Sequence, residues 1–227
     1  MRTYKVVIVG NYRWSFYEKA LLEGFQNTGH SARRYVIKSI DIKTQVLSMN
    51  RLRTINRKFY TEIIKDPPDI IFLYRVNEIY QSTLIRLHLA IPDIFIIGYH
   101  NDNPYKGSRN NIKYWNFLKD LSEMDLVYVY RESNFRHALN MGAKNVRLLM
   151  PYYYSKLHLN HNIDLTSKNY DVVYVGHVED DGRIETMDYL LKNGVHLHIF
   201  GPDWDKVGRK KNWPARNIHG PVYEFEY

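Results

Sequence analysis

Runs of apolar, β-branched residues alternate with helical patterns along most of this chain of 227 residues. The first run, "YKVVIVG" at 4–10, ends in glycine and precedes a helical pattern over about 16–27. The alternation continues through "PPDIIFLYR" at 67–75 and "DIFIIGYHND" at 93–102. Strands that are separated by helices pair in parallel, because a helical crossover returns the chain to the same end of the sheet. The pattern therefore predicts an α/β fold whose parallel sheet is covered by helices on both faces.

About six strands are expected before Pro151. Besides the three runs above, they are "ARRYVI", "DLVYVYR" and "NVRLLMP", and further helices are expected around 40–65, 80–90, 111–121 and 133–141. Residues 1–150 are therefore predicted to form a Rossmann-like domain with a parallel sheet.

The strand pattern starts again late in the chain. Polar and aromatic residues without clear periodicity fill 151–169, which we interpret as a linker. "YDVVYVG" at 170–176 then predicts a strand, 180–193 predicts a helix with an acidic first turn, and "HLHIFGP" predicts another strand. Only 58 residues remain from the start of this pattern, whereas a complete doubly wound domain commonly needs about 100. Residues 170–227 are therefore predicted to be the first part of a second Rossmann-like domain.

The composition fits a protein of a reducing compartment. Cysteine is absent, which excludes disulfides and thiolate metal sites. The longest apolar stretches are too short to span a bilayer, and the N-terminus enters a strand pattern without a basic and apolar leader. We therefore expect a cytoplasmic location.

The net charge of +8 is concentrated near the N-terminus. Residues 33–58 hold eight basic side chains and one acidic side chain, Asp41. In the helix expected over 40–65, apolar residues form a stripe with basic residues on both sides. Such a stripe packs on a sheet, which we favour, or lies on the inner membrane surface with its arginines on lipid headgroups. Nucleic acid is not expected as a partner, since no glycine and aromatic reading motif accompanies the basic segment.

Polar residues gather where the predicted strands end. Ligands of open parallel sheets bind at this edge, although any α/β protein turns polar there. The residues are Asn11, Arg75, His100, Asn101, Asp102, Asn103 and Arg131 in the first domain, and Gly176, His177, Glu179, Gly201, Asp203 and Trp204 in the second.

Two of these groups allow a functional and a structural interpretation. His100 and Asp102 suit a general base or a pair that orients a hydroxyl, whereas "NDNP" also suits an Asx turn. A metal site there lacks further ligands at a readable spacing. The turn "VGHVEDDGR" suits a phosphate, with Arg183 adding a guanidinium, whereas Asp180 or Asp181 equally suits a helix cap. Neither the dinucleotide fingerprint nor the P-loop motif occurs.

The sequence resembles a known family over about 95–227. The resemblance is carried by "HNDNP", by "DLVYVYRESNFRHALNMGAKNVRLLMPYYYSKLH", and most strongly by "VGHVEDDGR" and "FGPDWD". These segments are similar to the glycosyltransferases of the two-domain GT-B type that are related to the spore maturation protein CgeB.

The resemblance implies two facing Rossmann-like lobes and a transferase that works without a bound metal or cofactor. It would move a sugar from a nucleotide-diphosphate sugar to a glycan or glycolipid acceptor, in surface glycan or polysaccharide synthesis. Arg183 would stabilise the departing diphosphate. His100 or Asp102 would accept the proton of the acceptor in an inverting enzyme and would only position the acceptor in a retaining one, and the sequence does not decide between the two. The other residues that the resemblance places at the cleft are Gly176, His177, Asp203 and Trp204 on the donor side, and Asn11, Asn101 and Arg131 on the acceptor side.

One departure from the family concerns the donor site. Such enzymes usually place the acidic residue for the donor ribose, and most of the base pocket, farther along the second lobe than this chain extends. We therefore expect weak or no transferase activity from this chain by itself. Two alternatives stay open: a non-catalytic α/β module that docks on lipid or protein, and one half of a split transferase.

Overall fold

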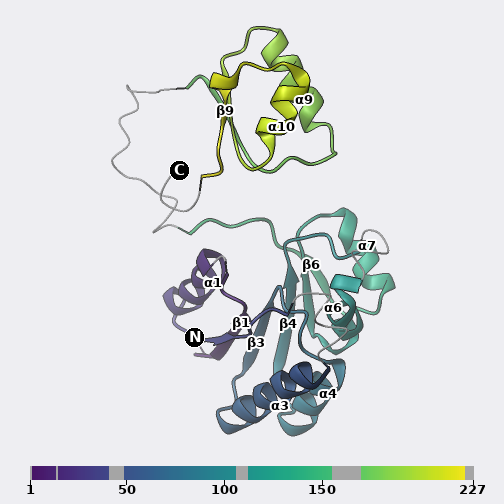
Figure 1. Ribbon diagram of the computed structural model, residues 1–227. Coiled ribbons are helices and arrows are strands. Elements are labelled where there is room, and N and C mark those ends of the chain that lie inside the picture. The colour runs from purple at the N-terminus through teal and green to yellow at the C-terminus, as the bar shows by residue number, and fades with distance from the viewer. Residues whose placement is uncertain (1, 14, 41–48, 106–111, 155–169, 223–227) are drawn as a thin grey trace. The chain divides into compact units, whose positions relative to one another are not determined.

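The computed structural model describes residues 2–13, 15–40, 49–105, 112–154 and 170–222 (Figure 1). The chain divides into two compact units, Met1–Ser155 and Lys156–Tyr227, and each is described by itself. Both units are α/β, so the predicted fold class is confirmed.

The first unit is built on one sheet of six parallel strands in the order β2-β1-β3-β4-β5-β6. The predicted number of strands in this part of the chain is confirmed, and each expected apolar run overlaps one of them. The strands are β1 (Lys5–Gly10), β2 (Ser31–Val36), β3 (Ile70–Tyr74), β4 (Phe95–His100), β5 (Leu126–Val129) and β6 (Val146–Leu148).

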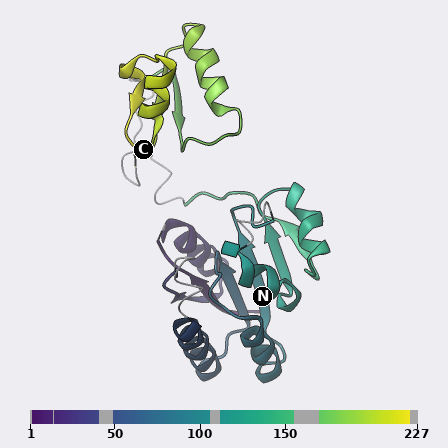
Figure 2. The ribbon, with the colours of Figure 1, turned by 45° about the vertical axis from the view of Figure 1, so that its right-hand side comes forward.

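The strand order reverses at β1, and this reversal places helices on both faces of the sheet. The chain moves from β1 outward to β2, crosses back to β3, and continues to β6 in the opposite direction. Because crossovers between parallel strands are right-handed, helices before and after the reversal fall on opposite faces. One face therefore carries α1 (Ser15–Asn27), and the other carries α3 (Met49–Lys65), α4 (Gln81–Ala90), α6 (Trp115–Asp120) and α7 (Ser133–Asn140). The helices α3 and α4 lie side by side in both views (Figures 1 and 2).

Alternate residues of each strand fill two cores. Val9 of β1 packs on the α3 side with Phe59 and Ile63 of α3, and all three are 0 % exposed. Ile8 packs on the α1 side, in a core rich in tyrosine and phenylalanine. Each such side chain contributes about 1.5–3 kcal/mol by its burial. The apolar stripe of the basic helix is therefore packed on the sheet, as we favoured; the part of that helix expected over 41–48 lies outside the described residues.

The second unit holds three parallel strands in the order β7 (Val172–Val175), β8 (Leu197–Phe200) and β9 (Ile218–His219). The chain crosses this sheet in one direction only, so its helices α9 (Arg183–Lys192) and α10 (Trp204–Lys211) fall on the same face. On the other face, Val173 and Val175 are 47 % and 42 % exposed. The expectation that helices cover both faces of the sheet, which was drawn from the strands before Pro151, holds for the first unit. The described part of the second unit has helices on one face of its sheet.

Candidate functional site

The carboxyl ends of β1 and β3 form the switch point of the first sheet, where the chain leaves in opposite directions. Ligands of open parallel sheets bind at such a point. Gly10 ends β1, and Arg75 follows β3 with a φ of 53°. A side chain larger than glycine rarely adopts this left-handed conformation, and such strain gathers at functional sites.

Asp102 is the centre of a charged group at this edge. Its Oδ2 accepts hydrogen bonds from the Arg75 guanidinium at 2.9 Å and from the Tyr114 hydroxyl at 3.1 Å, and the Lys113 ammonium lies 3.9 Å away. Burial raises the pKa of the Asp102 carboxyl, but Arg75, His100, Lys113 and the Tyr114 hydrogen bond together hold that pKa below its usual value. Asp102 is therefore an ionised, partly exposed carboxylate that can orient a hydroxyl group.

His100 lies in the apolar core beside α6. Its ring packs edge-on against Tyr114 at 4.7 Å and Phe117 at 4.9 Å between centroids, and the residue is 2 % exposed. Neither ring nitrogen has a hydrogen-bond partner among the described residues. Burial lowers the pKa of His100 to about 3, with Asp102 opposing and Arg75 adding to this shift. The prediction that His100 faces a ligand is not met, because a neutral, enclosed ring cannot reach an acceptor.

The other predicted residues of the first unit lie at the same edge but differ in their surroundings. Asn11 closes the turn after β1, since its Oδ1 accepts a hydrogen bond from the Arg13 amide at 2.9 Å. Asn101 has a buried Oδ1 without a partner in the described part of the chain. Arg131 is exposed, with its guanidinium 5.6 Å from the ring centroid of Tyr130. Of these three, Asn101 alone presents a buried polar atom that still needs a partner.

Sequence reasoning missed Glu18, which folds back from α1 over the end of β1. Its Oε1 accepts a hydrogen bond from the Tyr12 amide at 2.9 Å, and a Cβ on Gly10 would lie 2.8 Å from the same oxygen. Glycine at the strand end therefore admits this carboxyl group. Burial raises the pKa of Glu18, opposed by its backbone hydrogen bonds and by Arg75, and its Oε2 has no partner among the described residues. In the sequence, the only signal is an acid in the first turn of a helix, which is usually a dipole partner.

The turn 176–182 follows β7 in the second unit, and two neighbouring elements hold it. The Gly176 amide donates to the Phe200 carbonyl at 2.9 Å, and the Gly176 carbonyl accepts from Trp204 Nε1 at 2.7 Å. Gly201, with a φ of 152°, lies so close that a Cβ there would meet the Gly176 oxygen at 2.0 Å. Trp204 is 0 % exposed. It therefore supports the turn from inside the core. The prediction that Trp204 borders a cleft is not met.

Arg183 is engaged by residues of its own turn. Its guanidinium donates to both carboxylate oxygens of Asp181, to Glu179 at 3.2 Å, to the Tyr174 hydroxyl at 2.9 Å and to the His177 carbonyl at 2.8 Å. The hydrogen bond with Arg183 lowers the pKa of Asp181 below its usual value. The Glu179 and Asp181 side chains are 60 % and 46 % exposed, so water competes for both ion pairs. The Arg183 guanidinium, which the sequence analysis places at a diphosphate, is thus paired with exposed carboxylates.

The two helices of the second unit begin without side-chain caps. The helix α9 begins at Arg183 after Gly182, whose φ is 91°, so Gly182 and neither Asp180 nor Asp181 takes the cap position. The Asp181 Oδ1 still accepts a hydrogen bond from the Arg183 amide, at 3.4 Å, from one position before the cap. A glycine adopts this left-handed conformation at no steric cost. Asp203 precedes α10 with a φ of 65° and is exposed at the surface.

Metal ligands do not converge in the part of the chain that the structure describes. Three histidines of the second unit do touch one another on the exposed face of its sheet. His198 Nδ1 lies 2.8 Å from His219 Nε2, and His198 Nε2 lies 3.1 Å from His196 Nε2. The ring nitrogens therefore bond to one another in a chain and do not point at a common centre.

Comparison with known proteins defines the fold further. No family model and no curated protein matches the sequence. Solved structures match along nearly the whole chain. MnaA of S. aureus in complex with UDP has a TM-score of 0.55 and 13 % identity, over 96 % of this chain and 68 % of that one.

Two further structures agree with this match. HepE of Anabaena in complex with UDP and glucose has a TM-score of 0.56 and 12 % identity, over 97 % of this chain and 70 % of that one. The UDP-N-acetylglucosamine 2-epimerase from Rickettsia bellii has a TM-score of 0.52 and 13 % identity, over 100 % of this chain and 70 % of that one. At these identities the likeness shows the fold alone, which is GT-B-like. The relation to the CgeB-related group stays a prediction.

Proposed function

We propose that this chain is a glycosyltransferase of the GT-B type, which binds a nucleotide-diphosphate sugar in its second unit and an acceptor in its first. The observation that carries the proposal is a fold shared with two proteins whose structures hold UDP, in one case together with glucose. The polar carboxyl ends of the strands in both units fit this division. The reaction breaks the bond from the anomeric carbon to the diphosphate and forms one to an acceptor oxygen, in surface glycan or polysaccharide synthesis.

On the donor side, the turn 176–182 is proposed to hold the diphosphate. Amide groups at the start of α9 attract anions, and Gly176 has no side chain that would keep a phosphate away. Arg183 would exchange Asp181 and Glu179 for phosphate oxygens. The exchange replaces the two hydrogen bonds to Asp181 with charge-assisted hydrogen bonds to phosphate oxygens, which match the same guanidinium geometry. Arg183 would then stabilise the charge that develops on the leaving diphosphate.

On the acceptor side, Asp102 is proposed to orient the acceptor hydroxyl and to receive its proton. Arg75 and Tyr114 hold one carboxylate oxygen of Asp102. The second oxygen, which has no hydrogen bond from a described residue, would face the substrate. The low pKa of Asp102 keeps it ionised, so it accepts a proton only as the acceptor oxygen attacks. His100 fills the core beside this group and takes no part in the proton transfer.

The donor site is tested by calorimetric titration of the full chain with UDP-, GDP- and dTDP-sugars. We expect at least one UDP-sugar to bind, Arg183→Ala to weaken that binding by about tenfold or more, and Asp181→Asn to strengthen it, because a competing carboxylate is removed. Asp205→Asn is the matched control, since it removes an exposed carboxylate that pairs with Arg209 on α10 at 2.6 Å. It should leave the affinity unchanged.

Two results would count against this donor site. Absence of binding by every nucleotide sugar excludes it. If Asp181→Asn weakens binding as much as Arg183→Ala does, the ion pair only shapes the turn and Arg183 does not contact the donor.

A sugar-nucleotide epimerase is the second candidate, because similar structures include epimerases that act on UDP-N-acetylglucosamine. An epimerase needs no acceptor. Incubation of the full chain with a UDP-sugar alone, followed by NMR of the sugar, separates the two: a new epimer supports the epimerase, and release of UDP only when an acceptor is added supports the transferase.

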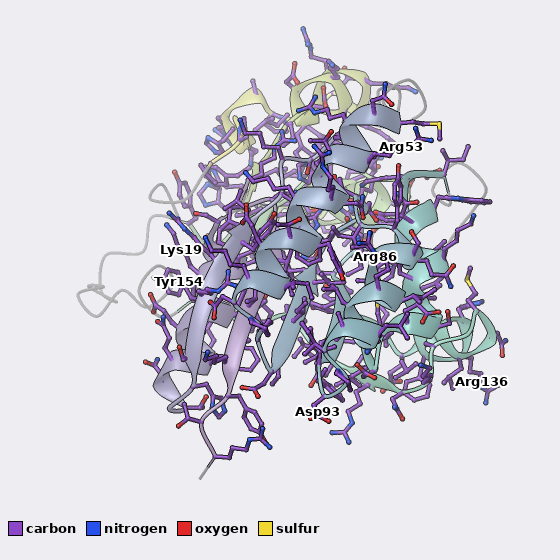
Figure 3. The ribbon with its side chains drawn as sticks, turned by 90° about the horizontal axis from the view of Figure 1, so that it is seen from below. Lys19, Arg53, Arg86, Asp93, Arg136 and Tyr154 are labelled. Carbon is purple, nitrogen blue, oxygen red and sulfur yellow. The ribbon has the colours of Figure 1, made fainter. Side chains whose placement is uncertain are left out.

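Contact with an anionic membrane surface is proposed through α3. Arg51, Arg53 and Arg57 are exposed there and have no ion pair among the described residues; Figure 3 shows Arg53 on this helix and Arg86 on the neighbouring α4. Among the described residues, none of the helices combines the length and the hydropathy that a bilayer span requires. Since the apolar stripe of α3 is buried, the contact would be electrostatic. Binding to phosphatidylglycerol vesicles that vanishes in high salt and after Arg51, Arg53 and Arg57 are all changed to Gln would support it.

A further inference from the structure

The switch point of the first sheet holds a pocket of about 90 Å³ on the α1 face. A water molecule needs roughly 10–15 Å³ by this kind of measure, so the space admits a group the size of part of a sugar ring. Aromatic rings make most of the wall. They are Tyr17 of α1, Tyr74 at the end of β3, Tyr99 of β4, and Tyr130 and Tyr152 farther along the chain.

Hydrogen bonds and ring contacts fix these walls. The Tyr99 hydroxyl donates to the Leu149 carbonyl at 3.1 Å, and the Tyr152 hydroxyl donates to the Tyr17 carbonyl at 3.2 Å. The Tyr74 ring lies 5.9 Å from Tyr17 and 5.8 Å from Tyr99 between centroids. The pocket is therefore preformed, which lowers the entropic cost of binding.

Two polar atoms of the lining residues are buried without a hydrogen-bond partner in the described part of the chain. They are the Tyr74 hydroxyl and Asn101 Oδ1. Leaving such an atom unpaired costs about 1–3 kcal/mol, so a native structure rarely keeps it without a reason. A ligand hydroxyl group can supply the missing partner of either atom, because it can accept from Tyr74 and can donate to Asn101.

The charges around the pocket exclude an anion. None of the residues that line it is charged. Burial raises the pKa of Tyr74 above its usual range, and Tyr17 and Glu18 add to this shift against Arg75. The Tyr74 hydroxyl therefore stays protonated. The guanidinium of Arg75 is paired with Asp102.

We propose that this pocket binds an uncharged, hydroxyl-bearing ring, the chemistry of a neutral sugar unit, whose hydroxyl groups pair with Tyr74 and Asn101. The tyrosine rings pack on the apolar faces of the sugar, and the paired hydroxyls fix its orientation. Asn101 precedes Asp102 in the chain, so the bound ring lies at the same strand end as the carboxylate. That this ring is the acceptor rests on the proposed function, whereas its binding does not.

The test is saturation-transfer NMR on the full chain with methyl glucoside, methyl galactoside and methyl N-acetylglucosaminide, beside glucuronate and glucose 6-phosphate as charged counterparts. We expect saturation of at least one neutral sugar, and none of the charged ones. Tyr74→Phe should weaken the binding by about tenfold, as loss of one hydrogen bond at a buried polar site does. The same variant should unfold at an equal or higher temperature, because it removes a buried hydroxyl that lacks a partner. A merely structural tyrosine would not combine a weaker affinity with an unchanged or raised stability.

Tyr105→Phe is the matched control. Its hydroxyl is also buried without a described partner, but it lies outside this pocket, where the ring stacks on His137 at 6.2 Å. This variant should show the same change in stability and unchanged sugar binding. The inference is overturned if no neutral sugar binds, if charged sugars bind equally well, or if Tyr74→Phe binds like the wild type. Donor binding is measured separately: sugar binding without nucleotide binding rejects the proposed transferase and keeps the pocket, and the reverse rejects the pocket alone.

Discussion

The two units place similar strands in different surroundings. Val9 of β1 and Val175 of β7 each precede a glycine at a strand end, yet Val9 is 0 % exposed and Val175 is 42 % exposed. The strand order explains this difference. A sheet that reverses direction, as the first does at β1, receives helices on both faces, whereas a sheet crossed in one direction receives them on one.

The same reversal decides how each unit builds its polar edge. In the first unit the connections after β1 and β3 leave the sheet in opposite directions, and Glu18, Arg75 and the tyrosine pocket lie at this end of the sheet. The described part of the second unit has no reversal. Its turn is instead held by the close approach of Gly176 and Gly201 and by a hydrogen bond from Trp204.

The largest effect is expected from Trp204→Ala. The indole is 0 % exposed and also bonds to the Gly176 carbonyl, so its removal should cost about 3–5 kcal/mol. A core as small as that of the second unit cannot absorb this loss. Hydrogen exchange should then show lost protection in β8 and retained protection in β4. Trp115→Ala, at a residue 58 % exposed on α6, should leave both unchanged. Loss of protection in both sheets together would show that the two units are a single cooperative core.

In the first unit, His100 is expected to lower the free energy of unfolding by about 2 kcal/mol as the pH falls from 7 to 5. Its pKa is lowered to about 3 in the folded state, against about 6.5 in an unfolded chain. The unfolded state therefore binds the extra proton below about pH 6.5, and the folded state loses stability as the pH falls from there. His100→Phe removes this loss. Its stability relative to the wild type should rise by about 2 kcal/mol between pH 7 and pH 5, as measured by denaturant unfolding.

Asp120 is a control for that experiment, because its contribution to stability changes with pH in the opposite direction. The carboxyl group is buried, and burial followed by Glu123 raises its pKa to about 8. The folded state then keeps a proton that the unfolded state releases, so stability falls as the pH rises from about 4 to 8. The advantage of Asp120→Asn over the wild type should shrink as the pH falls. If the stability difference from the wild type changed with pH in the same direction for both variants, the assignment of these pH dependences to His100 and Asp120 would be wrong.

An identical substitution in both sheets tests the comparison directly. Val9→Thr puts a hydroxyl into a closed core and should cost about 1–2 kcal/mol. Val175→Thr puts the same group on the exposed face of β7, where water satisfies it, and should change stability by less than about 0.5 kcal/mol. Denaturant unfolding and hydrogen exchange of β1 and β7 measure the two effects. Equal costs would mean that the exposed face of the second sheet is covered in solution.

The sequence predicts the elements of this fold better than their surroundings. Apolar runs such as "KVVIVG" and "VVYVG" predict β1 and β7 correctly, because a short run of apolar, β-branched residues indicates a strand in either sheet. They cannot report strand order, and the order decides whether a second layer of helices exists. The helix start at Arg183 was misplaced for a related reason: acids before a helix look like caps, but Gly182 takes that position and the acids pair with Arg183.

The candidate site was predicted in its location more than in its parts. Strand ends indicate where Asp102 and Asn101 lie, since polar residues follow apolar runs there. Asp102 is partly exposed whereas His100 is buried, and the sequence pattern around two residues this close together does not predict that difference. The pocket was missed because Tyr74 and Tyr99 look like core residues of their strands. Only the packing shows that the Tyr99 hydroxyl has a partner and that the Tyr74 hydroxyl has none within the described ranges.

The smallest effect is expected at His198, and it sharpens the comparison with His100. Burial lowers the pKa of His198, and the neighbouring His196, His219 and Arg216 lower it further against Asp171. The second unit should therefore also lose stability as the pH falls below the value of an unfolded histidine. The loss should be smaller than at His100, because His198 touches other histidines that can reorient and share a proton, whereas the His100 ring nitrogens are buried and have no hydrogen-bond partner among the described residues. His198→Phe should abolish the loss of hydrogen-exchange protection in β8 at low pH and should not change the loss in β4. His100→Phe should abolish the loss in β4 and should not change the loss in β8. If either variant altered both sheets, the two titrations would belong to one folding unit.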